Sequence, residues 1–449
     1  MVRSPLPGRA PIGGLDRGPK GALDRVPKGA FSAVGWVAVG SMLANVCAYA
    51  VHLGAGRWWL GPAEYGELAV LLSAQLVLTV PALALQAVVA REVVRARGDA
   101  PSGGGDRRIG GLVVRCALAV AALVAVAVPV VSVVASTSWP QTLAGLSAAP
   151  LLTIIGGGQG ILQGRRRFRT LGVVLAAVGV MRTAPMIAAL AVGAGPAGGL
   201  LAGAVGTAVA AVVVWGIAGA SRSAGPLPTA TVAAPNLLTV IRASQVQLVL
   251  VVAVSLDVLL SRAVLDPREA GVYAFGAIAT KVAFWLPQAV GVVVYPRLAD
   301  PATSRRSLRQ AAGVVAAIGL MLTVLGALAG PLLPVLIGDD YRQLSRLLGL
   351  FAYTGAAFSV LQVGLLAAIA HDRTRISALA WLFLGVEAAA IGLLGHSVTA
   401  LAVITAVAAT VSAVTTTLVA LQVSHPAAHH ALDVGAGDRR PSAATDPGT

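Results

Sequence analysis

Long apolar stretches separated by short polar connections dominate the chain from Phe31 onward. Each is long enough to cross about 30 Å of hydrocarbon as a helix. Only 11% of the residues are charged, whereas a soluble domain carries about 25%. The sequence does not show the ten-residue segments of alternating apolar and polar residues that are typical of outer-membrane β-barrels. The sequence therefore predicts an all-α polytopic membrane protein. We count twelve transmembrane helices, at approximately 31–53, 67–90, 111–134, 142–163, 170–192, 197–218, 237–261, 271–296, 310–337, 346–370, 376–394 and 398–422.

The basic residues predict the orientation of these helices. Lys and Arg number 33 against 18 Asp and Glu, a net charge of +15. If the amino terminus is cytoplasmic, the tails and even-numbered connections hold 24 of the 33 and the odd-numbered connections hold five. The positive-inside rule then places both termini in the cytoplasm. We expect a bacterial cytoplasmic (inner) membrane protein and, despite the charge excess, no nucleic-acid partner.

An internal repeat divides the chain in two. The segment from Arg57 to Ala69 aligns with Arg262 to Ala274 at an offset of 205, and six of the thirteen positions match. With one residue inserted, the match continues to Pro81 with Pro287 and Arg91 with Arg297. Parallel six-helix repeats around a central cavity are typical of alternating-access transporters.

The repeat predicts two pseudo-symmetric six-helix lobes, residues 31–222 and 237–422. Residues 223–236, rich in Pro, Ala and Thr, are the expected cytoplasmic linker. Residues 1–30, which contain a tandem eight-residue near-repeat, and residues 423–449 are expected to be disordered cytoplasmic tails.

Ionisable residues inside the predicted spans are functional candidates, because each costs about 2.5–3.5 kcal/mol at the bilayer centre. Arg182, Lys281 and Glu387 fall near the midplane, and Asp257 lies near an outer end. Arg182 has no acidic partner in its own lobe, which favours an anionic ligand. Lys281 and Glu387 could form a structural ion pair or act on substrate or protons. Asp257 could pair with Arg262 or bind a coupling ion.

Uncharged polar residues repeat along the first two spans. Asn45 and His52 share one helical face, and Gln75 and Gln86, eleven residues apart, share another. These side chains either join neighbouring helices or give the first lobe a polar, substrate-binding inner surface. In the fourth span, Gly156 to Gly158 are expected to break the helix.

Signatures of catalysis do not stand out. The outer connections are short, and no Walker A, HExxH or CxxC pattern occurs. Both cysteines, Cys47 and Cys116, lie in apolar segments, so a disulfide or thiolate metal site is not expected. The sequence predicts a protein that is not an enzyme and has no cofactor.

Several short motifs occur in a fixed order: LGPAEYG at 60–66, QGRRRF at 163–168, LDP at 265–267 with AGVY at 270–273, and LP at 286–287 leading to YPR at 295–297. In this order they resemble polysaccharide biosynthesis flippases of the multidrug, oligosaccharidyl-lipid and polysaccharide exporter superfamily. The likeness covers residues 31 to about 422.

The resemblance implies two six-helix lobes that move an undecaprenyl-diphosphate-linked oligosaccharide to the outer leaflet. Arg182 and Lys281 would then face the diphosphate, and Arg57 and Arg262 would attract it at the outer mouth. The implied partners are membrane lipid, a polysaccharide polymerase and glycosyltransferases. The arginine cluster that marks lipid II flippases and the early acidic residues of cation-coupled drug exporters are not evident.

Two alternatives stay open. The chain could export a small molecule, driven by H+ or Na+ through Glu387 or Asp257. It could be a non-transporting scaffold that binds lipid-linked precursor or a partner protein. A membrane transferase would need a carboxylate pair or a long outer loop, and the sequence shows neither.

Overall fold

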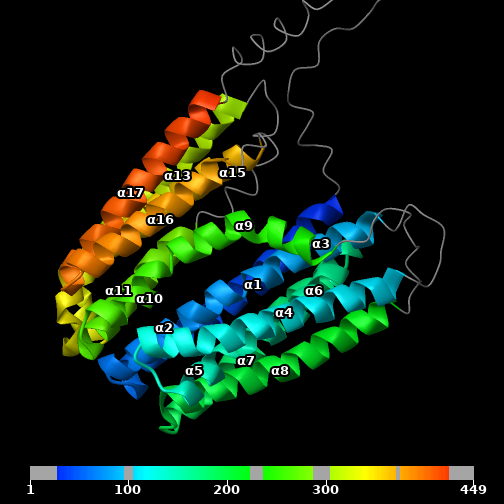
Figure 1. Ribbon diagram of the computed structural model, residues 1–449, viewed down its shortest axis with the longest axis horizontal. Coiled ribbons are helices and arrows are strands. Elements are labelled where there is room, and N and C mark those ends of the chain that lie inside the picture. Colours follow the sequence, from blue (N-terminus) through cyan, green and yellow to red (C-terminus); the bar gives the residue numbers. More distant parts are fainter. Residues whose placement is uncertain (1–27, 96–104, 223–235, 287–303, 371–374, 424–449) are drawn as a thin grey trace, which may run out of the picture.

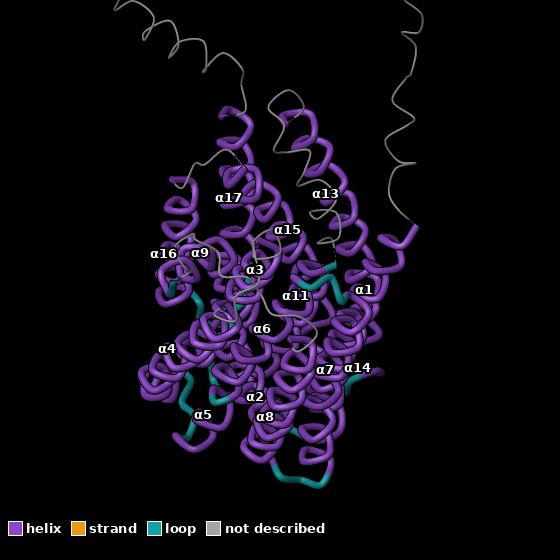
Figure 2. Tube along the Cα trace, turned by 90° about the vertical axis from the view of Figure 1, so that its right-hand side faces the viewer, coloured by secondary structure: helices purple, strands orange, loops and turns teal. Residues whose placement is uncertain are grey.

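The computed structural model describes residues 28–95, 105–222, 236–286, 304–370 and 375–423. Within them the chain forms helices joined by loops, without a strand (Figure 2). Of the predicted tails and linker, only residues 28–30, 236 and 423 are described, so those predictions lie outside the described residues.

The amino-terminal lobe contains the helices that precede residue 223. They are α1 (Lys28–Gly54), the π-helical η2 (Ala55–Trp59), α2 (Pro62–Leu78), α3 (Val80–Arg95), α4 (Gly105–Val134), α5 (Trp139–Leu146), α6 (Ala148–Gly164), α7 (Phe168–Ala191) and α8 (Gly195–Arg222).

The carboxy-terminal lobe follows the same plan. Its elements are α9 (Leu237–Ala253), α10 (Leu256–Val264), α11 (Pro267–Trp285), α13 (Ser304–Ala329), η4 (Gly330–Leu332), α14 (Leu333–Leu336), η5 (Asp339–Arg346), α15 (Leu348–Ala370), α16 (Arg375–Leu394) and α17 (Val398–Val423). In Figure 1, α9, α10 and α11 run between the helices of the first lobe and the layer formed by α13, α15, α16 and α17.

The protein is an all-helical polytopic membrane protein, as predicted. Nine helical segments of the described chain are long and apolar enough to cross a membrane. The bent pair α9 and α10, which meet at 45°, forms a tenth. The other two predicted spans coincide with α16, whose apolar part is shorter, and α11, which carries Arg268, Glu269 and Lys281.

The two copies of the repeat begin equivalent helices. Pro62 starts α2 and Pro267 starts α11, where a missing N–H costs nothing. Glu64 accepts a bond from the Gly61 N–H at 3.2 Å, and Asp266 accepts from the N–H groups of Arg268 and Glu269. These caps satisfy the free N–H groups of both helix starts, so the local sequence fixes where each helix begins.

The lobes cross where α2 meets α11. A Cβ added to Gly271 would lie 1.7 Å from the Pro62 carbonyl oxygen, and one added to Gly66 would lie 3.0 Å from the Gly271 Cα. Gly66 and Gly271 are equivalent residues of the repeat. The duplicated glycine therefore lets the two backbones touch.

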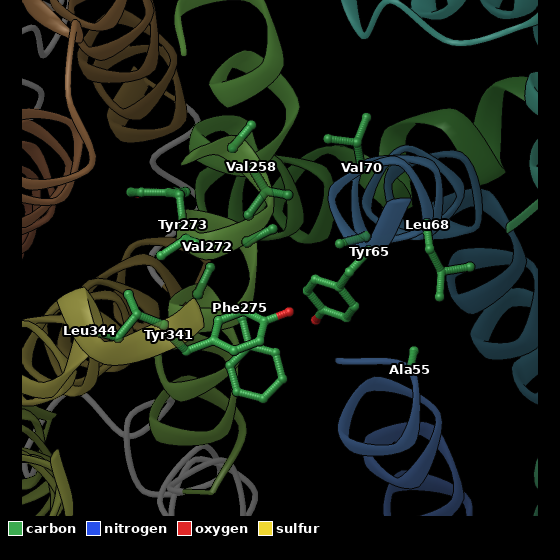
Figure 3. Close-up of a cluster of buried hydrophobic side chains, with 14 of the residues drawn as sticks. Ala55, Tyr65, Leu68, Val70, Val258, Val272, Tyr273, Phe275, Tyr341 and Leu344 are labelled. Carbon is green, nitrogen blue, oxygen red and sulfur yellow. The ribbon is translucent and has the colours of Figure 1, made fainter. Parts of the chain in front are cut away.

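Beside this crossing lies a buried aromatic cluster drawn from both lobes (Figure 3). The ring of Tyr65 lies 5.4 Å from that of Phe275, which lies 4.7 Å from that of Tyr341. We call this end of the molecule, with η2, the start of α2, the α10–α11 connection and η5, the junction end.

The predicted break at Gly156 to Gly158 is wrong. Helix α6 continues through all three residues, and the span is interrupted instead at Ser147, between α5 and α6. The glycines are close-packing positions, because a Cβ on Gly156 would meet the Ala82 carbonyl at 2.6 Å and one on Gly157 would meet Val113 at 2.5 Å.

Candidate functional site

Helix α2 brings together the two basic residues that the sequence places near the membrane midplane. Two polar side chains, Ser73 and Gln75, are buried in the apolar part of this helix. Each accepts a hydrogen bond from a cation of a different helix. We call Arg182, Lys281, Ser73 and Gln75 the cation site.

Arg182 reaches Gln75 from α7 within the first lobe. Its Nη2 donates a hydrogen bond to Gln75 Oε1. The amide of Gln75 in turn donates from Nε2 to the Gly145 carbonyl at 2.7 Å. The α5 backbone thus fixes the orientation of the Gln75 amide, and this amide orients the half-buried guanidinium of Arg182.

Lys281 comes from the second lobe. Its Nζ donates to Ser73 Oγ at 2.8 Å, so the bond joins α11 to α2 across the lobe boundary. Within its own lobe the ammonium interacts electrostatically with the Asp257 carboxylate. The ion pair with Glu387, one of the two alternatives left by the sequence, is not formed, and in the described part of the chain neither Lys281 nor Arg182 is in a salt bridge.

His52 completes the surroundings of the cation site. Its Nδ1 lies 3.0 Å from the Tyr65 hydroxyl, and it experiences the charges of both Lys281 and Arg182. Arg182 and Lys281 bond to residues two positions apart on α2, in a low-dielectric region where buried cations favour an anion nearby. The arrangement can therefore bind a multivalent anion.

A second polar group lies wholly in the carboxy-terminal lobe. Asp257, at the start of α10, accepts from the Tyr273 hydroxyl at 2.8 Å and from the Val258 N–H at 2.8 Å. The Tyr273 hydroxyl lies 3.4 Å from Thr405 Oγ1 of α17. Thr405 also interacts with Glu387 of α16, whose buried Oε1 has no hydrogen-bond partner. We call Asp257, Tyr273, Thr405 and Glu387 the carboxylate site.

Asp257 does not pair with Arg262, which was one of its two possible roles. Arg262 is buried at the junction end, where its Nε donates to the Ala135 carbonyl at 2.6 Å and its Nη1 to the Ala63 carbonyl at 3.2 Å. Its Nη2 lies 3.5 Å from Glu67 Oε1. All three partners belong to the other lobe.

Arg57, the repeat equivalent of Arg262, makes the reciprocal contact. Its Nη1 donates to the Ile337 carbonyl of the second lobe at 3.4 Å. The nearby Tyr341 hydroxyl is buried without a partner, and burial, together with the Asp340 carboxylate, raises the pKa of Tyr341. In this structure both arginines join the lobes, whereas the resemblance to polysaccharide flippases implies that they attract substrate.

The other two candidates lie apart from the cation site. Gln86 of α3 donates to Gln163 Oε1 of α6 at 3.0 Å, and Asn45 of α1 is exposed. Of the predicted residues, the structure groups Arg182, Lys281 and Gln75 in one place and Asp257 and Glu387 in another.

Sequence reasoning missed Ser73, Tyr273 and Thr405. A lone Ser, Tyr or Thr in an apolar helix is common, so none carried a signal of its own.

Several solved structures of transporters share this architecture. An inward-facing multidrug resistance MATE family transporter superposes with a TM-score of 0.63 at 11% identity, covering 87% of this chain and 98% of its own. The outward-facing conformation of such a transporter gives 0.59 at 12% identity, covering 87% and 95%. The lipid II flippase MurJ, in an inward closed conformation, gives 0.61 at 10% identity, covering 90% and 93%.

The chain shares its fold with these proteins, and the two MATE family transporters are described as members of the MOP superfamily. The two-lobed, all-helical prediction is thereby confirmed, and the structures that it resembles are transporters rather than enzymes. No protein-family model and no curated protein matches the sequence. The likeness to the polysaccharide branch of the superfamily stays a prediction.

Proposed function

We propose that this chain is a flippase that moves a polyprenyl-diphosphate-linked oligosaccharide, a precursor of cell-surface polysaccharide, across the cytoplasmic membrane by alternating access. The observation that carries the proposal is the convergence of Arg182 and Lys281, from opposite lobes, on one helix. A diphosphate carries several negative charges, and Arg and Lys bind phosphate oxygens through charge-assisted hydrogen bonds.

The position of the cation site also supports a lipid-linked substrate. Arg182 lies on α7, which is long and apolar enough to cross a membrane, and Lys281 lies on α11, which coincides with a predicted span. A diphosphate head group could then enter between the lobes while its polyprenyl tail stays in the lipid. A site shared by two lobes suits alternating access, because a rocking motion changes the distance between Arg182 and Lys281. MurJ, which has this fold, is described as a lipid II flippase.

The orientation is part of the proposal. The 24-to-5 division of basic residues supports cytoplasmic termini in a bacterial inner membrane. The junction end, which contains the odd-numbered connections, is then the outer end, and the lobes meet there. Cysteines placed in the tails and at the junction end, labelled with an impermeant maleimide in intact cells, test this: labelling of the tails alone would overturn it.

A flipping assay in proteoliposomes tests the function. A fluorescent polyprenyl-diphosphate oligosaccharide is added, and its movement between leaflets is compared for the intact protein, Arg182→Gln and Lys281→Met. The control is Arg115→Gln, since Arg115 is exposed and its Nε bonds only to its own helix, at the Gly111 carbonyl. We expect the first two variants to lose at least 90% of the rate and the control to keep it. Equal rates in all proteins would refute the assignment.

The carboxylate site favours one second candidate. Asp257 and Glu387 are both buried, and Glu387 Oε1 lacks a partner, as in a site that binds a proton or Na+. This arrangement would also serve an H+- or Na+-coupled exporter of small molecules. Such an exporter would move a cationic dye under an ion gradient and would ignore polyprenyl diphosphates. A non-transporting scaffold would move neither, and would tolerate neutral residues at 182 and 281.

A further inference from the structure

The turn that joins α6 to α7 places an arginine where glycine is favoured. The N–H of Arg166 donates to the Gln163 carbonyl at 3.0 Å and that of Arg167 to the Leu162 carbonyl at 2.9 Å, so α6 ends in a Schellman motif. Arg166 takes the left-handed position of this motif, with a φ of 57°. Glycine adopts that conformation without strain, whereas a residue with a Cβ does not. Strain of this kind indicates that the side chain of Arg166 has a role of its own.

A second arginine of the turn is held against an aromatic ring. Arg169, in the first turn of α7, has its Cζ 5.1 Å from the ring centroid of Trp36 on α1. Arg166, Arg169 and Trp36 are all exposed, and in the described part of the chain neither arginine is in a salt bridge. Two guanidinium groups three residues apart, next to an indole ring, therefore offer positive charge to an anion at one end of the first lobe.

The ring of Trp36 begins an apolar stripe on α1. The stripe consists of exposed residues that share one face at helical spacing: Trp36, Val39, Leu43 and Val46. Asn45, nine residues from Trp36, and His52, sixteen residues from it, lie on the opposite face of the helix. The stripe therefore faces away from the polar side of α1.

Helix α7 continues the stripe. Val173 and Val180 are exposed and lie on the same face of α7 as Arg169, four and eleven residues after it. Arg182 of the cation site follows Arg169 by thirteen residues, which turns it about 220° away from that face. The exposed apolar face of the two helices marks a surface that lipid chains cover.

The seam between α1 and α7 is closed beside the stripe. A Cβ added to Gly40 would overlap the Gly172 carbonyl oxygen, and one added to Gly179 would lie 2.7 Å from the Ala44 Cα. The two backbones are thus in contact at two levels. A molecule that lies on the stripe stays on the outer surface of the lobe, apart from the cation site.

We propose that this turn and the stripe bind an anionic phospholipid, such as phosphatidylglycerol or cardiolipin. Arg166 and Arg169 donate charge-assisted hydrogen bonds to the phosphate oxygens, whose geometry the planar guanidinium matches. Trp36 holds the head group at the membrane interface, and the acyl chains cover the stripe. Helix α1 runs from this site to η2 at the junction end, so the bound lipid belongs to the leaflet at the other end of the molecule.

Two features favour a phospholipid over other anions. A soluble phosphate would satisfy the arginines and leave the apolar stripe bare, whereas a phospholipid matches the charge and the stripe together. A transported lipid-linked substrate has to reach the space between the lobes, and the contact of α1 with α7 closes that route. The site is therefore independent of the cation site and of the transported molecule.

Native mass spectrometry of the full-length protein in detergent micelles measures the binding. Dioleoyl phosphatidylglycerol and dioleoyl phosphatidylcholine, which have the same chains and differ in head-group charge, are added separately. We expect the intact protein to bind phosphatidylglycerol more tightly, and the double variant Arg166→Gln, Arg169→Gln to lose about 30-fold in that affinity. The control, Arg306→Gln with Arg309→Gln, removes two exposed arginines of the same spacing from α13 and should keep it.

A single substitution separates lipid binding from folding. Arg166→Gly removes the guanidinium and relieves the strain of the turn. Its Tm without added lipid should therefore not fall, while its affinity for phosphatidylglycerol should fall about fivefold. A lower Tm with unchanged affinity would show that Arg166 serves only the fold, and would overturn its role in binding.

The remaining outcomes decide the identity of the ligand. Equal binding of the two lipids by the intact protein, or an equal loss in the double variant and the control, would overturn the site. Displacement of phosphatidylglycerol by an equal concentration of inorganic phosphate would show that the stripe contributes nothing. Tighter binding of geranylgeranyl diphosphate than of phosphatidylglycerol, lost in the same double variant, would assign the turn to the transported substrate. Either result would overturn the assignment to a phospholipid.

Discussion

Replacing Arg262 should separate the lobes at the junction end. Arg262→Met keeps the length and apolar stem of the side chain and removes its hydrogen bonds. Two of these bonds, to the carbonyls of Ala135 and Ala63, cross between lobes at 2.6 and 3.2 Å. The 3.5 Å contact with Glu67 is too long to contribute much.

The size of the effect follows from these bonds. A hydrogen bond to a charged group contributes about 1.5–3 kcal/mol net. Once the lobes separate, water forms hydrogen bonds with the exposed carbonyls and offsets some of the lost free energy. We therefore take roughly 3 kcal/mol as the contribution of the two bonds together. Since about 1.4 kcal/mol is a factor of ten, the ratio of closed to separated molecules should fall about 100-fold.

Distances between spin labels measure this ratio. Trp58 of η2 and Val335 of α14 are exposed residues of opposite lobes near the junction end. Labelled cysteines at these two positions, in a protein lacking Cys47 and Cys116, should give a short distance in the parent. Arg262→Met should add a population at longer distance.

A matched control distinguishes the loss of the Arg262 hydrogen bonds from a general effect of removing a positive charge. Arg268 is also at the junction end, but its 2.5 Å contact with Asp340 is exposed and lies within one lobe. An exposed pair contributes about 0–1 kcal/mol, so Arg268→Met should leave the distances unchanged. An unchanged distribution in Arg262→Met, with the label pair shown to respond to substrate, would refute the reasoning.

Other substitutions test single contacts. Ser73→Ala should weaken binding of a polyprenyl diphosphate about tenfold, while Ser73→Thr, which keeps the hydroxyl, should restore it; equal affinities would count against a role in positioning Lys281. Gly271→Ala should cost about 1–3 kcal/mol, seen as a lower Tm in a thermal scan, because its Cβ would overlap the Pro62 carbonyl; an unchanged Tm would contradict the close crossing. Gln86→Leu removes the hydrogen bond to Gln163, so it should lower the Tm slightly and leave flipping intact. Loss of flipping would instead indicate that Gln86 binds substrate.

The helices and the lobes could be predicted because their signals are local. Twelve apolar stretches gave the spans, and the Gly-Pro and Asp-Pro pairs at 61–62 and 266–267 gave the starts of α2 and α11. The repeat then implied the pairing of the lobes. Each of these inferences depends on residues close in sequence or at one fixed offset.

The contacts between lobes could not be predicted in the same way. The sequence shows that Arg262 is basic and near an outer end, but not that the Ala135 and Ala63 carbonyls are its acceptors, because every residue has a carbonyl. The same limit explains why the glycines at 156–158 predict a helix break, although they are packing positions. A sequence does not show which neighbouring backbone a glycine must admit.

The repeat explains why the charged residues could be found but not given roles. Duplication makes the two lobes alike in plan, so charged residues enter the spans of both. Their roles depend on what the neighbouring helices supply. Arg182 bonds to the neutral amide of Gln75, and Lys281 reaches Ser73 across the lobe boundary. Asp257 accepts instead from the Tyr273 hydroxyl of its own lobe. An apolar stretch or a fixed offset does not indicate which helices pack together, so these partners follow only from the three-dimensional structure.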